Sequence, residues 1–170
     1  VRATVREGRD RMRGTLLSWL PDDLRGLRIL DAGCGRGGTA DYLHRNGWGQ
    51  VVGIDIEARS IEAARQNYPN INFLACDVCD VDQYVDVHPD VVCMFNAYYC
   101  FKDQSKALAA LSRIARPHTR MIIFDHVDRG GYRDNPLMDA AGMVEVPKWR
   151  HALINIAHPL LKQGLVRSEE

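Results

Sequence analysis

The chain has 170 residues, of which 46% are hydrophobic and 26% are charged, and its 22 basic side chains balance 22 acidic ones. A chain of this length is most simply one domain with a complete hydrophobic core. The balanced charge excludes the basic excess of a nucleic-acid-binding surface, and no apolar run approaches the roughly 18 residues of a membrane span.

The first predicted element is an N-terminal helix within residues 1–20, because the apolar residues between Val5 and Leu20 share one helical face. After it, apolar strands alternate with amphipathic helices. In chain order, the pattern predicts a strand at 27–32, a helix at 38–46, a strand at 50–56, a helix at 57–68, strands at 71–77 and 90–95, a helix at 103–115 and a strand at 120–126.

This alternation predicts an α/β fold with a doubly wound, mainly parallel sheet and helices on both faces. The pattern weakens after residue 126. Residues 138–149 are ambiguous, 152–163 resemble a helix, and 164–170 could begin a sixth strand, so we expect an incomplete C-terminal strand pair. The expected organisation is one domain over 1–170, with an N-terminal helix at 1–20, a ligand-binding core at 28–126, and a substrate cover with the start of the last strands at 127–170.

A glycine turn follows the first predicted strand in the stretch LDAGCGRGGT, which runs from Leu30 to Thr39. Its glycines match the G-x-G-x-x-G spacing of dinucleotide-binding turns, but Asp31 lies two residues before the first of them. A carboxylate about 5 Å from a phosphate charge costs roughly 3 kcal/mol at an effective dielectric near 20. Asp31 therefore favours a cationic ligand over a pyrophosphate, unless it only caps the turn.

Two more carboxylates lie at the ends of predicted strands. Asp55 comes about 20 residues after the glycine turn, where an acid can accept hydrogen bonds from both hydroxyls of a ribose. Asp77 ends the third strand, where it can accept an adenine amino group while Ile56 and Val78 enclose the ring. Ligands of such sheets bind at the carboxyl ends of the strands, so we expect a nucleoside site there.

Four segments, ILDAGCGRGG, VVGIDI, FLACDV and DVVCMFNAYYCF, resemble motifs I to IV of class I S-adenosylmethionine-dependent methyltransferases in order and spacing. The resemblance covers residues 28–126. It implies a Rossmann-like methyltransferase fold, S-adenosylmethionine as the cofactor, and methyl transfer to O or N of a small-molecule acceptor. The net charge of +1 on this cofactor suits Asp31. The expected cofactor-binding residues are Asp31, Gly33, Cys34, Gly35, Gly37, Asp55, Ile56, Asp77, Val78, Phe95 and Asn96.

The residues that act on the acceptor are expected after the fourth and fifth strands. Tyr99 follows the fourth strand, and His126 ends the fifth, where a histidine can remove a proton from a hydroxyl or carboxyl acceptor near neutral pH. Both positions also suit structural roles, in an apolar wall for Tyr99 and bonded to a loop for His126, so the catalytic residue stays open. Further positions expected near the acceptor are Asn96, Tyr98, Asp125, His151 and His158.

The N-terminal stretch 4–35 also resembles the start of magnesium-protoporphyrin O-methyltransferases, which methylate a porphyrin propionate. Its predicted helix carries four arginines that could meet an acidic acceptor or the cofactor carboxylate, and the alternative is a solvated basic face. These are Arg6, Arg9, Arg11 and Arg13. The later segment 124–136 lacks this resemblance, so the porphyrin is one candidate among small metabolites.

The five cysteines indicate reduced thiols, because an odd number lies in predicted core strands. We therefore expect a cytoplasmic location, and the charged first residues do not fit a secretory signal. Cys76 and Cys79 form a lone C-x-x-C pair without a second pair or a matching histidine, so no metal site is expected. Two other functions fit the architecture: a nicotinamide-dependent oxidoreductase, which Asp31 disfavours, and a non-catalytic S-adenosylmethionine-binding domain.

Overall fold

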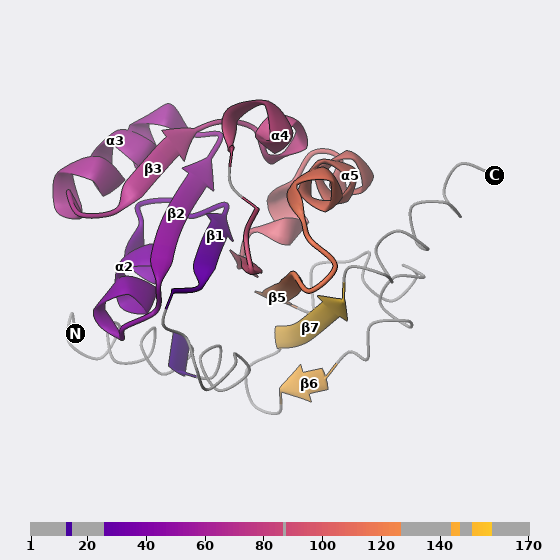
Figure 1. Cartoon of the computed structure of the whole chain (residues 1–170). Coiled ribbons are helices and arrows are strands. Elements are labelled where there is room, and N and C mark those ends of the chain that lie inside the picture. The colour runs from indigo at the N-terminus through magenta and orange to yellow at the C-terminus, as the bar shows by residue number, and fades with distance from the viewer. Residues whose placement is uncertain (1–12, 15–25, 87, 127–143, 147–150, 158–170) are drawn as a thin grey trace.

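The computed structural model describes residues 13–14, 26–86, 88–126, 144–146 and 151–157 (Figure 1). Within these residues one sheet has the strand order β3-β2-β1-β4-β5-β7-β6. Its parallel strands are β1 (Arg28–Ala32), β2 (Gln50–Asp55), β3 (Asn72–Ala75), β4 (Val91–Phe95) and β5 (Arg120–His126). Two antiparallel strands, β7 (His151–Ala157) and β6 (Val144–Val146), follow on the β5 side.

Helices connect the parallel strands. They are α2 (Gly38–Arg45), α3 (Ala58–Asn67), α4 (Val81–Tyr84) and α5 (Gln104–Ile114), with short 3₁₀ helices η1 (Val78–Asp80) and η2 (Tyr98–Cys100). Side chains cap two of the α-helices: Glu57 accepts the N–H of Arg59 at the start of α3, and Asp103 accepts the N–H of Lys106 at the start of α5. The strands and helices predicted between residues 27 and 126 are confirmed, with ends that differ by at most two residues. No helix of the described residues is long and apolar enough to cross a membrane.

Successive residues of each strand point to opposite faces of the sheet. Both faces are buried, because helices pack against each of them. On β1, Ile29 packs with residues of α2 and α3, whereas Leu30 packs with residues of α4 and α5. On β5, Ile122 and Ile123 divide in the same way. This explains why β4 is apolar throughout and confirms the doubly wound architecture, with helices on both faces.

The expectation of an incomplete C-terminal strand pair is wrong. Residues 151–157, which overlap the segment expected to be helical, form β7 and pair with the whole of β5, from Arg120 opposite Ala157 to His126 opposite His151. Without β7 the backbone donors and acceptors along this edge of β5 would be unpaired, so tertiary pairing outweighs the local pattern. The N-terminal helix lies outside the described residues except for Arg13 and Gly14, which are helical, and 164–170 also lie outside them.

The strand order reverses between β1 and β4. The chain leaves β1 toward β2 on one side, while β4 pairs with β1 on the other. Ligands of open α/β sheets bind outside the carboxyl ends of the strands at such a switch point. The fold therefore directs attention to the ends of β1, β2, β3 and β4.

Candidate functional site

A cavity of about 490 Å³ lies at this switch point, a size that suits a small organic ligand. Residues at the ends of β1, β2, β3 and β4 line it. The sequence-predicted residues in its wall are Gly33, Gly35, Asp55, Ile56, Asp77, Val78 and Asn96. Sequence reasoning missed the other wall residues, which are Ile54, Cys76, Ala97, Cys100, Phe101 and Lys102.

The glycine turn after β1 forms one wall. Gly33 has a φ of +80°, a left-handed conformation that an L side chain rarely adopts. The N–H groups of Gly33 and Cys34 donate to the carbonyl oxygen of Ile54 at 2.8 and 2.9 Å, which fastens the turn to β2. A Cβ on Gly33 would lie 2.4 Å from the Cβ of Ala97. The backbone of the turn therefore lies directly against the segment that leads into η2.

Two backbone donors fix the Asp55 carboxylate at the end of β2. The N–H of Gly35 donates to Oδ2 at 2.8 Å, and the N–H of Glu57 donates to Oδ1 at 2.9 Å. Each carboxylate oxygen has a second lone pair, and the side chain lines the cavity. Asp55 thus presents an oriented acceptor pair to a ligand and also ties β2 to the glycine turn.

Asp77 begins η1 on the next wall. Its Oδ1 accepts the N–H of Cys79 at 2.9 Å, which caps the short helix. Burial raises the pKa of the Cys76 and Cys79 thiols to about 11 each. The neighbouring Asp77 carboxylate is the next cause in both cases. Both thiols stay protonated at neutral pH, and the described residues contain no group of three or more metal-ligating side chains.

Asp31 lies beneath the turn and outside the cavity wall. The side chain is 1% exposed, its Oδ1 accepts from the Cys93 thiol at 3.8 Å, and its Oδ2 has no hydrogen-bond partner among the described residues. Burial raises the pKa of Asp31 to about 7, although the positive charge of Arg13 opposes this shift. Asp31 therefore changes its charge close to neutral pH.

Replacing Asp31 with asparagine should make the free energy of unfolding less dependent on pH. The pKa of Asp31 is higher in the folded chain than the ordinary value of 3.8 for an aspartate. The folded state therefore binds more protons between about pH 4 and pH 7, and its stability falls as the pH rises through that window. The free energy of unfolding should fall between pH 4.5 and 7.5 by about 2–4 kcal/mol less in Asp31→Asn than in the wild type. Urea unfolding at the two pH values measures this difference. Parallel pH profiles for the two proteins would contradict this role for Asp31.

Arg13 approaches the turn from the N-terminal segment. Its guanidinium carbon lies 5.9 Å from the centre of the Tyr42 ring on α2. A Cβ on Gly38, the first residue of α2, would lie 2.7 Å from Nη2 of Arg13. The positive charge of Arg13 therefore lies over the start of α2 and near Asp31. Arg6, Arg9 and Arg11 lie outside the described residues.

Asn96 directly follows β4 and has a left-handed conformation, with a φ of +53°. Its N–H donates to the carbonyl oxygen of Phe124 at 2.7 Å, which holds the backbone in place. Its Oδ1 is buried and has no hydrogen-bond partner among the described residues. A strained backbone and an unsatisfied acceptor in a cavity wall are both features of ligand-binding positions.

Three predicted cofactor residues support the wall without lining the cavity. Cys34 is buried, and its thiol donates to the carbonyl oxygen of Gly35 at 3.7 Å. Gly37 leaves room for Phe73, whose Cζ would lie 2.7 Å from a Cβ at that position. Phe95 stacks on Phe124, with ring centres 4.9 Å apart.

Tyr99, one of the two catalytic candidates, does not line the cavity. Tyr99 lies in η2, half-buried and packed against the core beside α5. His126 is the last residue of β5, and its backbone lies opposite His151 of β7. The structure describes only the backbone of these two histidines. Tyr98 is 2% exposed and packs edge-on against Phe101, and His158 lies outside the described residues.

This sheet, with its glycine turn and its acidic residues at the ends of β2 and β3, fits a class I S-adenosylmethionine-dependent methyltransferase, and the comparisons with known proteins assign the chain to that class. The chain belongs to the methyltransferase-domain family, whose sequence profile matches residues 30–123. The resemblance drawn from motifs I to IV is therefore confirmed.

Relatives and solved structures agree with this class. A magnesium-protoporphyrin O-methyltransferase from Rhodobacter capsulatus is 47% identical over 85 residues, which are 47% of this chain and 38% of that protein. A fatty-acid O-methyltransferase from Mycolicibacterium smegmatis is 27% identical over 150 residues, which are 86% and 49% of the two chains. The chain thus spans less than half the length of these curated relatives.

Among solved structures, a TehB-like S-adenosylmethionine-dependent methyltransferase from Corynebacterium glutamicum has a TM-score of 0.66 at 21% identity, covering 92% of this chain and 99% of that one. The magnesium protoporphyrin IX methyltransferase ChlM from Synechocystis PCC 6803 was solved with bound S-adenosylmethionine. It has a TM-score of 0.68 at 21% identity, and the match covers 89% of this chain and 80% of that one. At these identities the structural similarity establishes the fold alone.

Proposed function

We propose that the protein transfers the methyl group of S-adenosylmethionine to O or N of a small-molecule acceptor. The observation that carries this proposal is the pair of oriented carboxylates, Asp55 and Asp77, in one cavity beside the glycine turn. The family relationship supports methyl transfer. The comparisons give no support to a nicotinamide-dependent oxidoreductase or to a non-catalytic binding domain.

The wall residues fit the parts of this cofactor. Asp55 would accept the two ribose hydroxyls and Asp77 the adenine amino group, while Ile56 and Val78 would enclose the ring. Ile56 is 69% exposed, which is unusual for an isoleucine and consistent with a ligand-contact role.

The methionyl end would lie along the glycine turn. Gly33 and Gly35 allow the backbone to approach it closely, and the Asn96 Oδ1 is an acceptor suited to its ammonium group. Arg13 carries the charge that its carboxylate requires. Asp31, buried beneath the turn, would act through the turn and through Arg13, and Cys34, Gly37 and Phe95 would act by supporting the wall.

The bound cofactor supplies a methyl carbon that its sulfonium already activates. The protein then has to align the acceptor, exclude water and, where the acceptor is protonated, remove a proton. We propose Tyr99 and His126 as candidates for the last task, because Tyr99 follows β4 and His126 ends β5. Residues 127–170 would provide the acceptor cover, and 1–170 would form one domain with the N-terminal helix at 1–20 and the core at 28–126.

We infer that the acceptor is a small molecule methylated at oxygen, because relatives at 47% and 27% identity are named O-methyltransferases. Magnesium protoporphyrin is the first acceptor to test, since the most similar of these stretches belongs to an enzyme named for it. A cytoplasmic location is supported by five free cysteines, four of them buried.

A thermal-shift assay tests the cofactor proposal. A ligand at 100 times its Kd adds about 2.7 kcal/mol of stability, so S-adenosylhomocysteine should raise the Tm by roughly 5–10 °C for a chain of this size. NAD should leave the Tm unchanged. A shift with NAD alone would overturn the proposal, and binding without transfer of a labelled methyl group to any acceptor panel would restrict it to cofactor binding.

A further inference from the structure

We propose that Asp80 and Lys106 are positioning residues for the cofactor, because with Cys79 and Asp103 they set the separation between two walls of the cavity. We call these four residues the clasp. The inference rests on the proposed function, since it assigns to them a part in holding the nucleoside half of S-adenosylmethionine.

The two walls come from different parts of the chain. Asp77 and Val78, at the start of η1, form one wall, and Cys100, Phe101 and Lys102, just before α5, form another. The width of the cavity between them depends on how η1 sits against the first turn of α5. Neither wall is part of a strand, so sheet hydrogen bonds do not set this distance.

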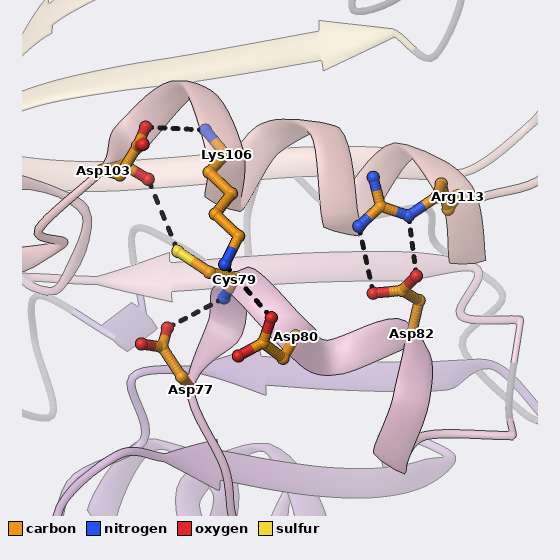
Figure 2. Close-up of polar contacts among 7 residues, drawn as sticks. All are labelled: Asp77, Cys79, Asp80, Asp82, Asp103, Lys106 and Arg113. Carbon is orange, nitrogen blue, oxygen red and sulfur yellow. Dashed lines mark hydrogen bonds and ion pairs between the residues drawn. The ribbon is translucent and has the colours of Figure 1, made fainter.

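The clasp joins the two elements at that point (Figure 2). The Lys106 ammonium of α5 pairs with Asp80 Oδ1 at 3.2 Å, and the Cys79 thiol donates to the carbonyl oxygen of Asp103 at 3.6 Å. Asp103 Oδ1 accepts the backbone N–H of Lys106 at 2.8 Å, which fixes the first turn of α5. The N–H of Cys79 donates to Asp77 itself, so the network ends on a carboxylate of the site.

A second ion pair between the same two parts of the chain offers a matched control. Arg113, seven residues further along α5, donates from Nε and Nη2 to Asp82 of α4 at 2.7 and 3.1 Å (Figure 2). This bidentate pair has the better geometry for stability, but none of its residues neighbours the cavity wall. A purely structural role predicts that Arg113 matters at least as much as Lys106 in every assay. A positioning role predicts that the two pairs differ in cofactor affinity.

The experiment measures the Kd of S-adenosylhomocysteine by calorimetry, and the Tm, for the full chain and its variants. We expect Lys106→Met and Asp80→Asn each to raise the Kd about two- to fivefold, the range set by the strength of an exposed ion pair. The double variant, Asp80→Asn with Lys106→Met, should bind S-adenosylhomocysteine as well as either single variant, because each substitution breaks the same ion pair. The reversed pair, Asp80→Lys with Lys106→Asp, should recover most of the affinity. In 1 M salt, which screens the ion pair, the Kd values of Lys106→Met and wild type should differ less.

Arg113→Met should change the Kd by less than about 1.5-fold while lowering the Tm at least as much as Lys106→Met. Equal Kd values for these two variants, or a reversed pair that recovers nothing, would overturn the clasp while leaving the proposed function intact. A wild-type chain that binds no S-adenosylhomocysteine would overturn the proposed function and the clasp with it.

Discussion

Asp55→Ala is expected to weaken S-adenosylhomocysteine binding at least about 100-fold, because hydrogen bonds to a charged group contribute about 1.5–3 kcal/mol each and Asp55 can make two to the ribose. The variant also leaves the N–H groups of Gly35 and Glu57 without their acceptor. Because the bond from Glu57 is exposed and the bond from Gly35 only part-buried, water can replace the lost acceptor, and we expect a smaller stability loss of about 1–2 kcal/mol. Calorimetric titration together with urea unfolding separates the two effects.

Asp41→Ala is the matched control for this substitution. Asp41 is also an aspartate near the glycine turn, but it pairs with Arg45 on the surface of α2 at 2.8 Å and does not line the cavity. Its loss should leave the Kd unchanged. If Asp55→Ala weakened binding no more than its stability loss explains, Asp55 would be a structural residue that only holds the glycine turn.

Gly33→Ala is expected to reduce both stability and binding. The left-handed φ of Gly33 alone costs an alanine about 1–2 kcal/mol. The new methyl group would also lie 2.4 Å from the Ala97 Cβ and 3.6 Å from the Phe101 ring, so the segment carrying these two wall residues must move. We expect a total stability loss of about 3 kcal/mol and a Kd raised more than about tenfold, from urea unfolding and calorimetry.

Gly47→Ala isolates the conformational part of this effect. Gly47 has almost the same φ, +79°, but a Cβ there would meet nothing within 4 Å. Its replacement should therefore cost only about 1–2 kcal/mol and leave the Kd unchanged. Equal losses from Gly33→Ala and Gly47→Ala would show that the contact with Ala97 is relaxed without consequence for the site.

The core of the fold could be predicted because its elements carry local signals. Residues 28–126 contain short apolar runs for buried parallel strands and amphipathic repeats for helices, and both depend on the chain's own periodicity. The last two strands could not be predicted in this way. Residues 151–157 become a strand because β5 offers a seven-residue edge, a cause that lies in another part of the chain.

In the site, too, the sequence predicts what local motifs and strand order determine, and not what depends on packing between distant parts of the chain. Asp55 and Asp77 could be placed because strand topology brings the carboxyl ends of β2 and β3 to one edge. Whether Asp31 points into the cavity or beneath the turn depends on the pleat and on packing against Cys93, which no motif encodes. The wall formed by Cys100, Phe101 and Lys102 depends on how η2 turns into α5, so sequence reasoning missed it.

A crystal structure of the chain with S-adenosylhomocysteine tests the central claim most directly. We expect the ligand in the cavity at the switch point, with its ribose hydroxyls within hydrogen-bonding distance of Asp55 and its adenine amino group bonded to Asp77. Ligand density elsewhere, or a diphosphate-bearing nucleotide held against the start of α2 in a parallel soak, would contradict it.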